Sequence, residues 1–209
     1  MFASDDSLPG SKAYRSVALL CTMCLVTGCA SRQVVQLPAM NDWEMRTAVL
    51  MDRQNWEFSG RIAVSAGKDG FNGKLRWYQQ DDTFRATVSG PLGIGTVRIE
   101  GDGQSVLLTD KDGVHTELQN AEEELRYRYG WTIPVGSLRY WALGIPDPMA
   151  PAQTELNPDN QLANLLQSGW TVDISRYRLN GGQSMPNRLS AKKFDTRVRI
   201  VIDKWKFFD

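Results

Sequence analysis

Large apolar residues alternate with polar ones from Trp56 to Val64, a period of two that is typical of a β-strand with one buried face. After a Gly-containing turn the alternation resumes from Phe71 to Trp77, which predicts an antiparallel hairpin. Further segments with strand character lie at 84–88, 96–100, 105–109, 114–118, 161–167, 169–177, 187–193 and 196–206. Many short strands at regular spacing predict an antiparallel sheet that curls into a sandwich or a barrel.

Three segments have a helical period instead. Residues 42–54 place apolar side chains among charged ones, with Asn41 or Asp42 as the N-cap. A second helix is predicted at 121–129 and a third at 136–143, where Gly144 and Pro146 would end it. Residues 146–160 are polar and rich in proline, which predicts a long loop.

The beginning of the chain has the pattern of an export signal. Two basic residues, Lys12 and Arg15, precede an uncharged apolar run of 12 residues at 16–27. A transmembrane helix needs about 20 apolar residues, so a cleaved signal peptide is the better interpretation.

The run ends in Leu-Val-Thr-Gly-Cys at 25–29, which resembles the lipobox of bacterial lipoproteins. This resemblance implies cleavage before Cys29 and attachment of lipid to its thiol; an ordinary signal peptide with a chance cysteine is the alternative. We therefore expect a signal peptide at 1–28, a lipidated tether at 29–41 and a folded domain at 42–209. Ala30 stands where an Asp would commonly retain a lipoprotein at the inner membrane, so we expect the outer membrane, on its periplasmic face.

Charge and candidate chemistry exclude several classes of function. Lys plus Arg and Asp plus Glu each number 24, so no net positive field favours nucleic acid. The three cysteines all lie within residues 1–29, so the CxxC at 21–24 falls in the expected signal peptide. His115 is the only histidine and lacks the partners of a catalytic triad. Residues 122–124 are acidic but lie near arginines, as on a solvated helix face. We expect no enzyme activity, no metal and no cofactor.

Aromatic residues are abundant, with seven Trp, seven Phe and six Tyr. A curved sheet with large apolar residues inside either fills its core or encloses a ligand cavity, and periodicity leaves both possibilities open. The turn at 89–95 places Leu92 between glycines and a proline. Leu92 either folds back under a neighbour or reaches a membrane or a partner.

Several motifs together resemble the LolB family of outer-membrane lipoproteins. Besides the lipobox and the helix around Trp43, they are GRIA at 60–63, LRWYQQ at 75–80, PLG at 91–93, IPVGSLRYWALGIP at 133–146, MP at 185–186 and KW at 204–205. The segment SLRYWALGIP is the most specific, because a Pro-Leu-Gly turn alone is common.

The resemblance implies a mainly β fold: an antiparallel sheet curled into an unclosed barrel, with helices lining or lidding an apolar cavity. It implies a receptor that accepts lipoproteins from the periplasmic carrier LolA and inserts them into the outer membrane, and we expect a monomer. The candidate cavity lining is Trp43, Phe58, Ile62, Trp77 and Trp141. The candidate membrane-delivery loop is Pro91, Leu92 and Gly93, with Ile94 as a second apolar residue. The alternative is a structural or envelope-assembly lipoprotein without a cavity for acyl chains.

Overall fold

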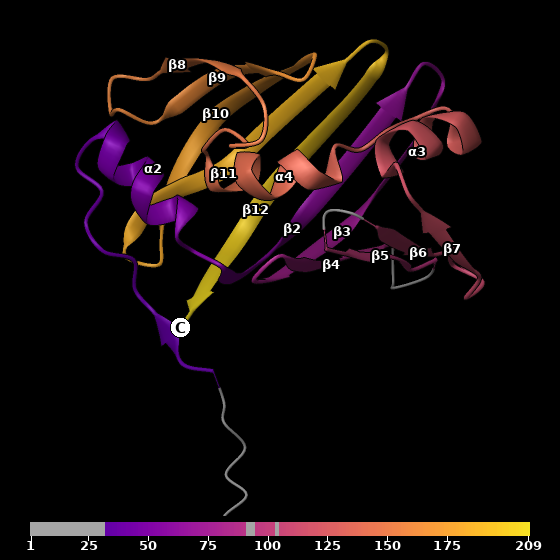
Figure 1. Cartoon of the computed structure of the whole chain (residues 1–209), viewed down its shortest axis with the longest axis horizontal. Coiled ribbons are helices and arrows are strands. Elements are labelled where there is room, and N and C mark those ends of the chain that lie inside the picture. The colour runs from indigo at the N-terminus through magenta and orange to yellow at the C-terminus, as the bar shows by residue number, and fades with distance from the viewer. Residues whose placement is uncertain (1–31, 91–94, 103–104) are drawn as a thin grey trace, which may run out of the picture. The chain divides into compact units, whose positions relative to one another are not determined.

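The computed structural model describes residues 32–90, 95–102 and 105–209. The chain divides into two compact units, residues 1–32 and 33–209. In its described part, the second unit contains one 12-stranded antiparallel sheet with the order β7-β6-β5-β4-β3-β2-β12-β11-β10-β9-β8, and β1 pairs with β12 (Figure 1).

Long strands form the middle of the sheet and shorter ones its two ends. The strands are β1 (Val34–Val35), β2 (Asn55–Ala66), β3 (Asp69–Gln80), β4 (Thr83–Ser89), β5 (Val97–Gly101), β6 (Val106–Thr109), β7 (His115–Leu118), β8 (Ala152–Leu156), β9 (Leu162–Gln167), β10 (Trp170–Asn180), β11 (Gln183–Lys193) and β12 (Thr196–Phe208). The hairpin predicted from the alternation is β2 with β3, in which Phe58 pairs with Trp77.

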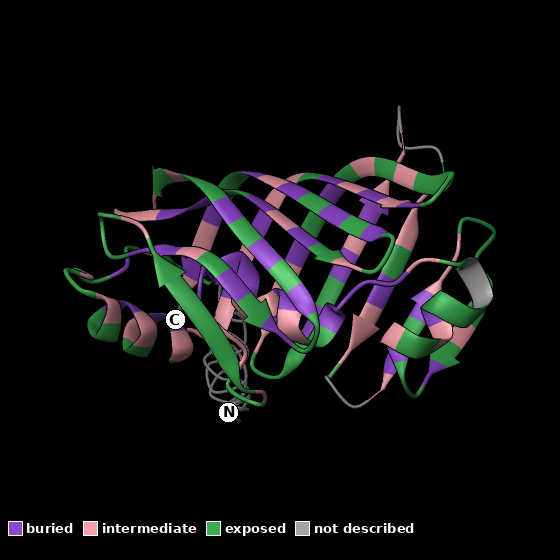
Figure 2. Ribbon diagram, turned by 90° about the horizontal axis from the view of Figure 1, so that it is seen from above, coloured by how far each residue is buried: buried purple, intermediate pink, exposed green. Residues whose placement is uncertain are grey.

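Burial alternates along the strands, as a sheet with one covered face requires (Figure 2). On β2 the side chains of Phe58, Ile62 and Val64 are buried, whereas Arg61 between them is exposed. We call the buried face the inner face and the opposite one the outer face.

Gly60 allows two strands to approach closely where the sheet bends. A Cβ atom at this position would lie 2.0 Å from the carbonyl oxygen of Val201 on β12, closer than any side chain permits. The register of β12 against β2 also shifts here, between Ile202 and Lys204. A bulge next to a glycine increases local twist and curvature, so the sheet can wrap around its inner face.

The sheet is curled but not closed. Its end strands are β7 and β8, and within the described residues these two strands do not pair with each other. The prediction of an unclosed antiparallel barrel with helices is therefore confirmed.

Helices lie against the inner face. The described helices are α2 (Trp43–Met51), α3 (Ala121–Tyr129) and α4 (Val135–Leu143), and Figure 1 shows α2 and α4 crossing the same side of the sheet. Asp42 is the N-cap of α2, since its carboxylate accepts a hydrogen bond from the backbone N–H of Met45 at 2.7 Å. Gly144 ends α4 in the left-handed conformation (φ +82°), as predicted.

Two segments differ from the sequence-based expectation. The loop expected at 146–160 contains β8, whose five residues are all exposed. This edge strand shows no apolar alternation because neither of its faces is buried, so the loop prediction was wrong there. Part of the expected tether is also folded: β1 pairs with the end of β12, and Leu37 is buried.

Candidate functional site

An aromatic band crosses the inner face at one end. Trp205, Phe58 and Trp77 are in register on β12, β2 and β3. Their ring centroids lie 5.1 Å apart for Phe58 and Trp205 and 6.2 Å apart for Phe58 and Trp77. Phe84 on β4 continues the band, 4.9 Å from Trp77. The band thus presents a continuous apolar surface across four neighbouring strands.

The indole nitrogens of this band have hydrogen-bond partners. Trp205 donates from Nε1 to the carbonyl oxygen of Pro186 at 3.1 Å. Trp77 donates from Nε1 to Oε1 of Gln79 at 3.1 Å, and Gln79 in turn donates to the carbonyl oxygen of Asp81. These bonds fix the ring orientations, because breaking them would leave buried donors unpaired.

Helix α4 covers the inner face through Trp141. The indole is fully buried and lies edge-on to Trp170 of β10, with 6.1 Å between ring centroids. Its Nε1 donates to Oε1 of Gln167 on β9 at 2.9 Å. The helix is therefore attached to the β10–β9 side of the sheet by both apolar and polar contacts.

Helix α2 inserts a charged side chain, Arg46, into the interior. Arg46 is 3% exposed, and its Nη2 donates to the carbonyl oxygen of Ser184 at 2.9 Å. Its guanidinium carbon lies 5.3 Å from the ring centroid of Tyr177, and its Nε has no hydrogen-bond partner among the residues that the structure describes. Burial lowers the pKa of Arg46 from its usual range. In the described part of the chain no carboxylate pairs with this guanidinium.

Tyr177 supports the same contact from the sheet. Its hydroxyl donates to the carbonyl oxygen of Leu162 at 2.8 Å. Burial raises the pKa of Tyr177 well above its ordinary value, and the opposing effect of the nearby Arg46 is smaller. A neutral phenol thus faces the charged guanidinium.

The structure brings most of the candidate lining residues together on the inner face. Phe58, Ile62, Trp77 and Trp141 are at most 4% exposed, and Trp43 is half-buried. Here these side chains pack against one another and fill the space under the helices, so their role as lining remains a prediction. Cys29, Pro91, Leu92, Gly93 and Ile94 lie outside the described residues.

Arg46 and Glu122 were missed by the sequence interpretation. Arg46 falls on the face that carries Trp43 and Leu50, since positions 43, 46 and 50 follow helical spacing, and a cation on that stripe was the available signal. Glu122 was expected on a solvated face. Instead, its Oε1 accepts from Nε1 of Trp170 at 3.1 Å and from Nζ of Lys193 at 2.7 Å. It joins α3 to the sheet.

None of the described helices is long and apolar enough to cross a bilayer. No three His, Cys, Asp or Glu side chains of the described part of the chain converge as metal ligands. His115 is exposed and shares a hydrogen bond with Thr109 at 3.0 Å.

Comparison with known proteins identifies the family. A family model described as outer membrane lipoprotein LolB matches residues 54–205. The outer-membrane lipoprotein LolB of Nitrosococcus oceani is 32% identical, covering 93% of this chain and 98% of its own. That of Pseudomonas fluorescens is 34% identical, covering 87% and 90%. A solved DUF1329 family protein from Desulfovibrio piger covers 78% of this chain and 89% of its own, at 6% identity and a TM-score of 0.49, too low to support an argument. The chain belongs to the LolB family of outer-membrane lipoproteins.

Proposed function

We propose that this protein receives lipoproteins from a periplasmic carrier of the LolA type, holds their acyl chains against its inner face and inserts them into the outer membrane. The observation that carries the proposal is the aromatic band on the inner face of an unclosed sheet, covered by helices. Membership of the LolB family supports the same role.

Lipid on Cys29 would hold the receptor at the membrane that its cargo must enter. Several acyl chains on one residue anchor far more durably than one, because each buried methylene contributes about 0.8 kcal/mol. For the same reason, exposing a free acyl chain to water costs a large free energy. The apolar faces of carrier and receptor should therefore meet directly during transfer.

Because the inner-face side chains are buried under the helices, we expect cargo to reach them when a helix moves away from the sheet. In the structure, α4 is attached to the sheet by the hydrogen bond between Trp141 and Gln167, and α2 by the hydrogen bond between Arg46 and Ser184. The α2 attachment contains an unpaired buried Nε, which has a desolvation cost without a compensating hydrogen bond. We infer that α2 separates from the sheet more easily than α4.

Site-specific photo-crosslinking tests this proposal on one strand. Phe71 and Tyr78 are both half-buried aromatic residues of β3, but they point to opposite faces. A benzophenone-bearing phenylalanine analogue at Phe71 should crosslink to an acylated lipoprotein supplied by the carrier, because this side chain packs on the inner face. The same analogue at Tyr78 is the matched control and should not. Equal crosslinking from both positions, or none from Phe71, contradicts the proposal.

One observation favours the second candidate, a structural lipoprotein with a solid core. The large inner-face side chains are almost completely buried against each other. If carrier-dependent transfer fails while the folded protein remains stable, this candidate replaces the first.

A further inference from the structure

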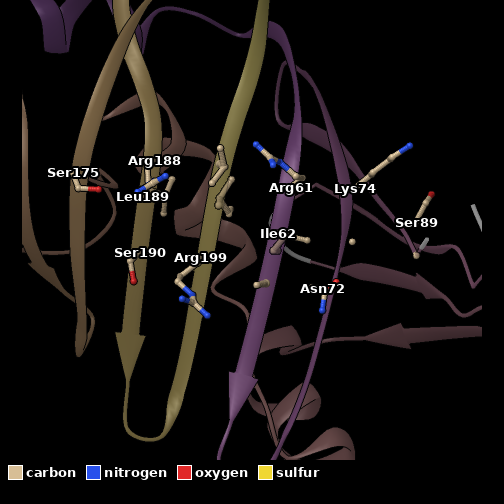
Figure 3. Close-up of a pocket in the computed structure, with 15 residues that line it drawn as sticks. Arg61, Ile62, Asn72, Lys74, Ser89, Ser175, Arg188, Leu189, Ser190 and Arg199 are labelled. Atoms are coloured by element: carbon tan, nitrogen blue, oxygen red, sulfur yellow. The ribbon is translucent and has the colours of Figure 1, made fainter. Parts of the chain in front are cut away.

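One hollow of the described surface lies on the outer face, away from the helices. It is a groove of about 650 Å³ across β3, β2, β12 and β11 (Figure 3). Small side chains, including Ala63 and Val201, lie between long basic ones, which hollows the face. Its polar lining includes Arg61, Lys74, Arg188, Arg199, Ser89 and Ser190. None of the described residues that line it is acidic.

Positive charge is concentrated here although the chain as a whole is neutral. Lys74 pairs in register with Arg61, and Val201 pairs with both Arg61 and Arg188, so three cations follow one row across the sheet. Arg199, two residues before Val201 on β12, adds a fourth cation to the groove. Figure 3 shows the four side chains on neighbouring strands around the groove.

Most of these charges have no ion-pair partner within the described part of the chain. Arg61 pairs with Asp203 at 3.1 Å, but both side chains are more than half exposed, so solvent weakens the pair. Among the described residues, no ion pair involves Lys74, Arg188 or Arg199. Like charges directly opposite each other destabilise a sheet, which makes this arrangement a cost in the free protein. A bound anion would remove that cost.

We propose that this basic groove binds the phosphate groups of anionic phospholipids on the surface of the membrane that carries the anchor. A groove of this volume accommodates a small headgroup, and hydroxyl groups beside guanidinium and ammonium groups suit phosphate oxygens. The inference rests on the proposed function for the choice of membrane.

Chain length favours a bilayer as the occupant. Four residues lie between Cys29 and Val34, where β1 begins, so the five steps from one Cα atom to the next span at most about 18 Å when fully extended. Lipid on Cys29 would therefore keep the domain close to the headgroups. Ser89 and Gly90 line the groove and, in sequence, directly precede the segment in which a turn with Leu92 is predicted. Contacts with headgroups would thus orient the domain on the bilayer.

The test measures binding of the mature chain with Cys29→Ser, which carries no lipid, to vesicles of phosphatidylglycerol and phosphatidylethanolamine. Phosphatidylcholine vesicles give the reference. The groove variant is Lys74→Gln, Arg188→Gln and Arg199→Gln combined. Its matched control is Lys68→Gln, Arg98→Gln and Arg178→Gln, which removes the same charge from exposed positions outside the groove.

We expect the parent to prefer anionic vesicles and the groove variant to bind them about 100-fold more weakly, since each basic residue near an anionic bilayer contributes roughly a fivefold factor. The control variant should keep most of the affinity. Equal loss in both variants, or no preference of the parent for anionic vesicles, overturns the proposal. If the groove variant unfolds, the single changes Lys74→Gln and Arg199→Gln should each weaken binding about fivefold.

Two further measurements complete the test. One distinguishes a lipid headgroup from a free phosphate ion, and the other distinguishes failure of this proposal from failure of the proposed function. Inorganic phosphate at constant ionic strength should not displace the parent from vesicles; complete displacement would indicate a free-anion site and overturn the lipid assignment. The groove variant should still accept cargo from the carrier in solution. If the groove variant binds vesicles normally but no longer accepts cargo from the carrier, the groove is a contact for an acidic protein. That result also overturns the proposal. Failure of the parent to accept cargo contradicts the proposed function alone.

Discussion

Trp141 on α4 donates a hydrogen bond from Nε1 to Oε1 of Gln167 on β9, 2.9 Å away in the buried space beneath the helix. Gln167 is 1% exposed. The same Oε1 accepts from the backbone N–H of Asp147, and its Nε2 donates to the carbonyl oxygens of Asp147 and Ala150. One side chain thus joins the helix, the segment after it and β9.

Replacing Gln167 with leucine should destabilise the protein by at least about 2 kcal/mol, because it leaves the indole and several backbone groups without partners. Chemical unfolding in urea measures the loss. Gln153→Leu on exposed β8 is the control and should change stability little. An unchanged midpoint for Gln167→Leu would show that water replaces these bonds.

Trp141→Phe tests whether this residue contacts cargo or only fills the core. The change removes the hydrogen bond to Gln167 and part of the buried ring, so we expect a moderate loss of stability. If Trp141 lines the path of the acyl chains, crosslinking of cargo from position 71 should fall even at temperatures where the variant is fully folded. Unchanged crosslinking would assign Trp141 to the core.

Stability should fall above about pH 10 because of Tyr177. Burial raises the pKa of Tyr177 in the folded protein, so the unfolded chain releases its phenolic proton first as the pH rises. The stabilising contribution is complete below the unfolded pKa and is lost progressively above it, by up to about 1.4 kcal/mol per pH unit. Urea unfolding between pH 9 and about pH 11 should show a shallower decline for Tyr177→Phe than for the parent. Equal slopes would contradict the assignment.

Cys29→Ser should abolish anchoring without affecting the fold, since the domain begins beyond this position. We expect to find the variant in the soluble periplasmic fraction. Its domain should melt at the same temperature as the domain of the parent protein. Retention in membranes after a high-salt wash would contradict lipid attachment at Cys29. Low-salt retention that high salt releases would instead indicate electrostatic contact.

Leu92→Glu should separate acceptance of cargo from its delivery. We expect Leu92 to project from its turn, so the change should alter stability by no more than about 0.5 kcal/mol. A carboxylate entering hydrocarbon costs several kcal/mol, so insertion into liposomes should fail while acceptance from the carrier persists. Cargo should then accumulate on the protein. A large fall in melting temperature, or normal insertion, would remove Leu92 from the delivery step.

The sequence was sufficient to predict most of the fold because one face of each long strand is buried. Alternation located β2 and β3, and a helical period located α3 at its observed bounds. The same signal fails where burial is absent or incomplete. Strand β8 has no buried side chain, and β1 has only two residues, held by pairing with distant β12.

The site was less predictable for a related reason. Periodicity shows which side chains of a strand share a face, and it correctly placed Phe58 and Ile62 on the same face of β2. It does not show how tightly they pack. The partners of Arg46 and Glu122 lie at Ser184 and Trp170, far away in sequence, so only the assembled fold could reveal them.

The free edges at β7 and β8 have a consequence for the size of the interior. In a closed barrel, strand number and stagger fix the radius, so the enclosed volume cannot grow without breaking the hydrogen bonds of a ladder. A sheet with two unjoined ends can flatten while every ladder between its strands stays intact. What lies on its inner face, rather than the sheet itself, then sets its radius, so under the proposed function one scaffold would fit acyl chains of different number and length.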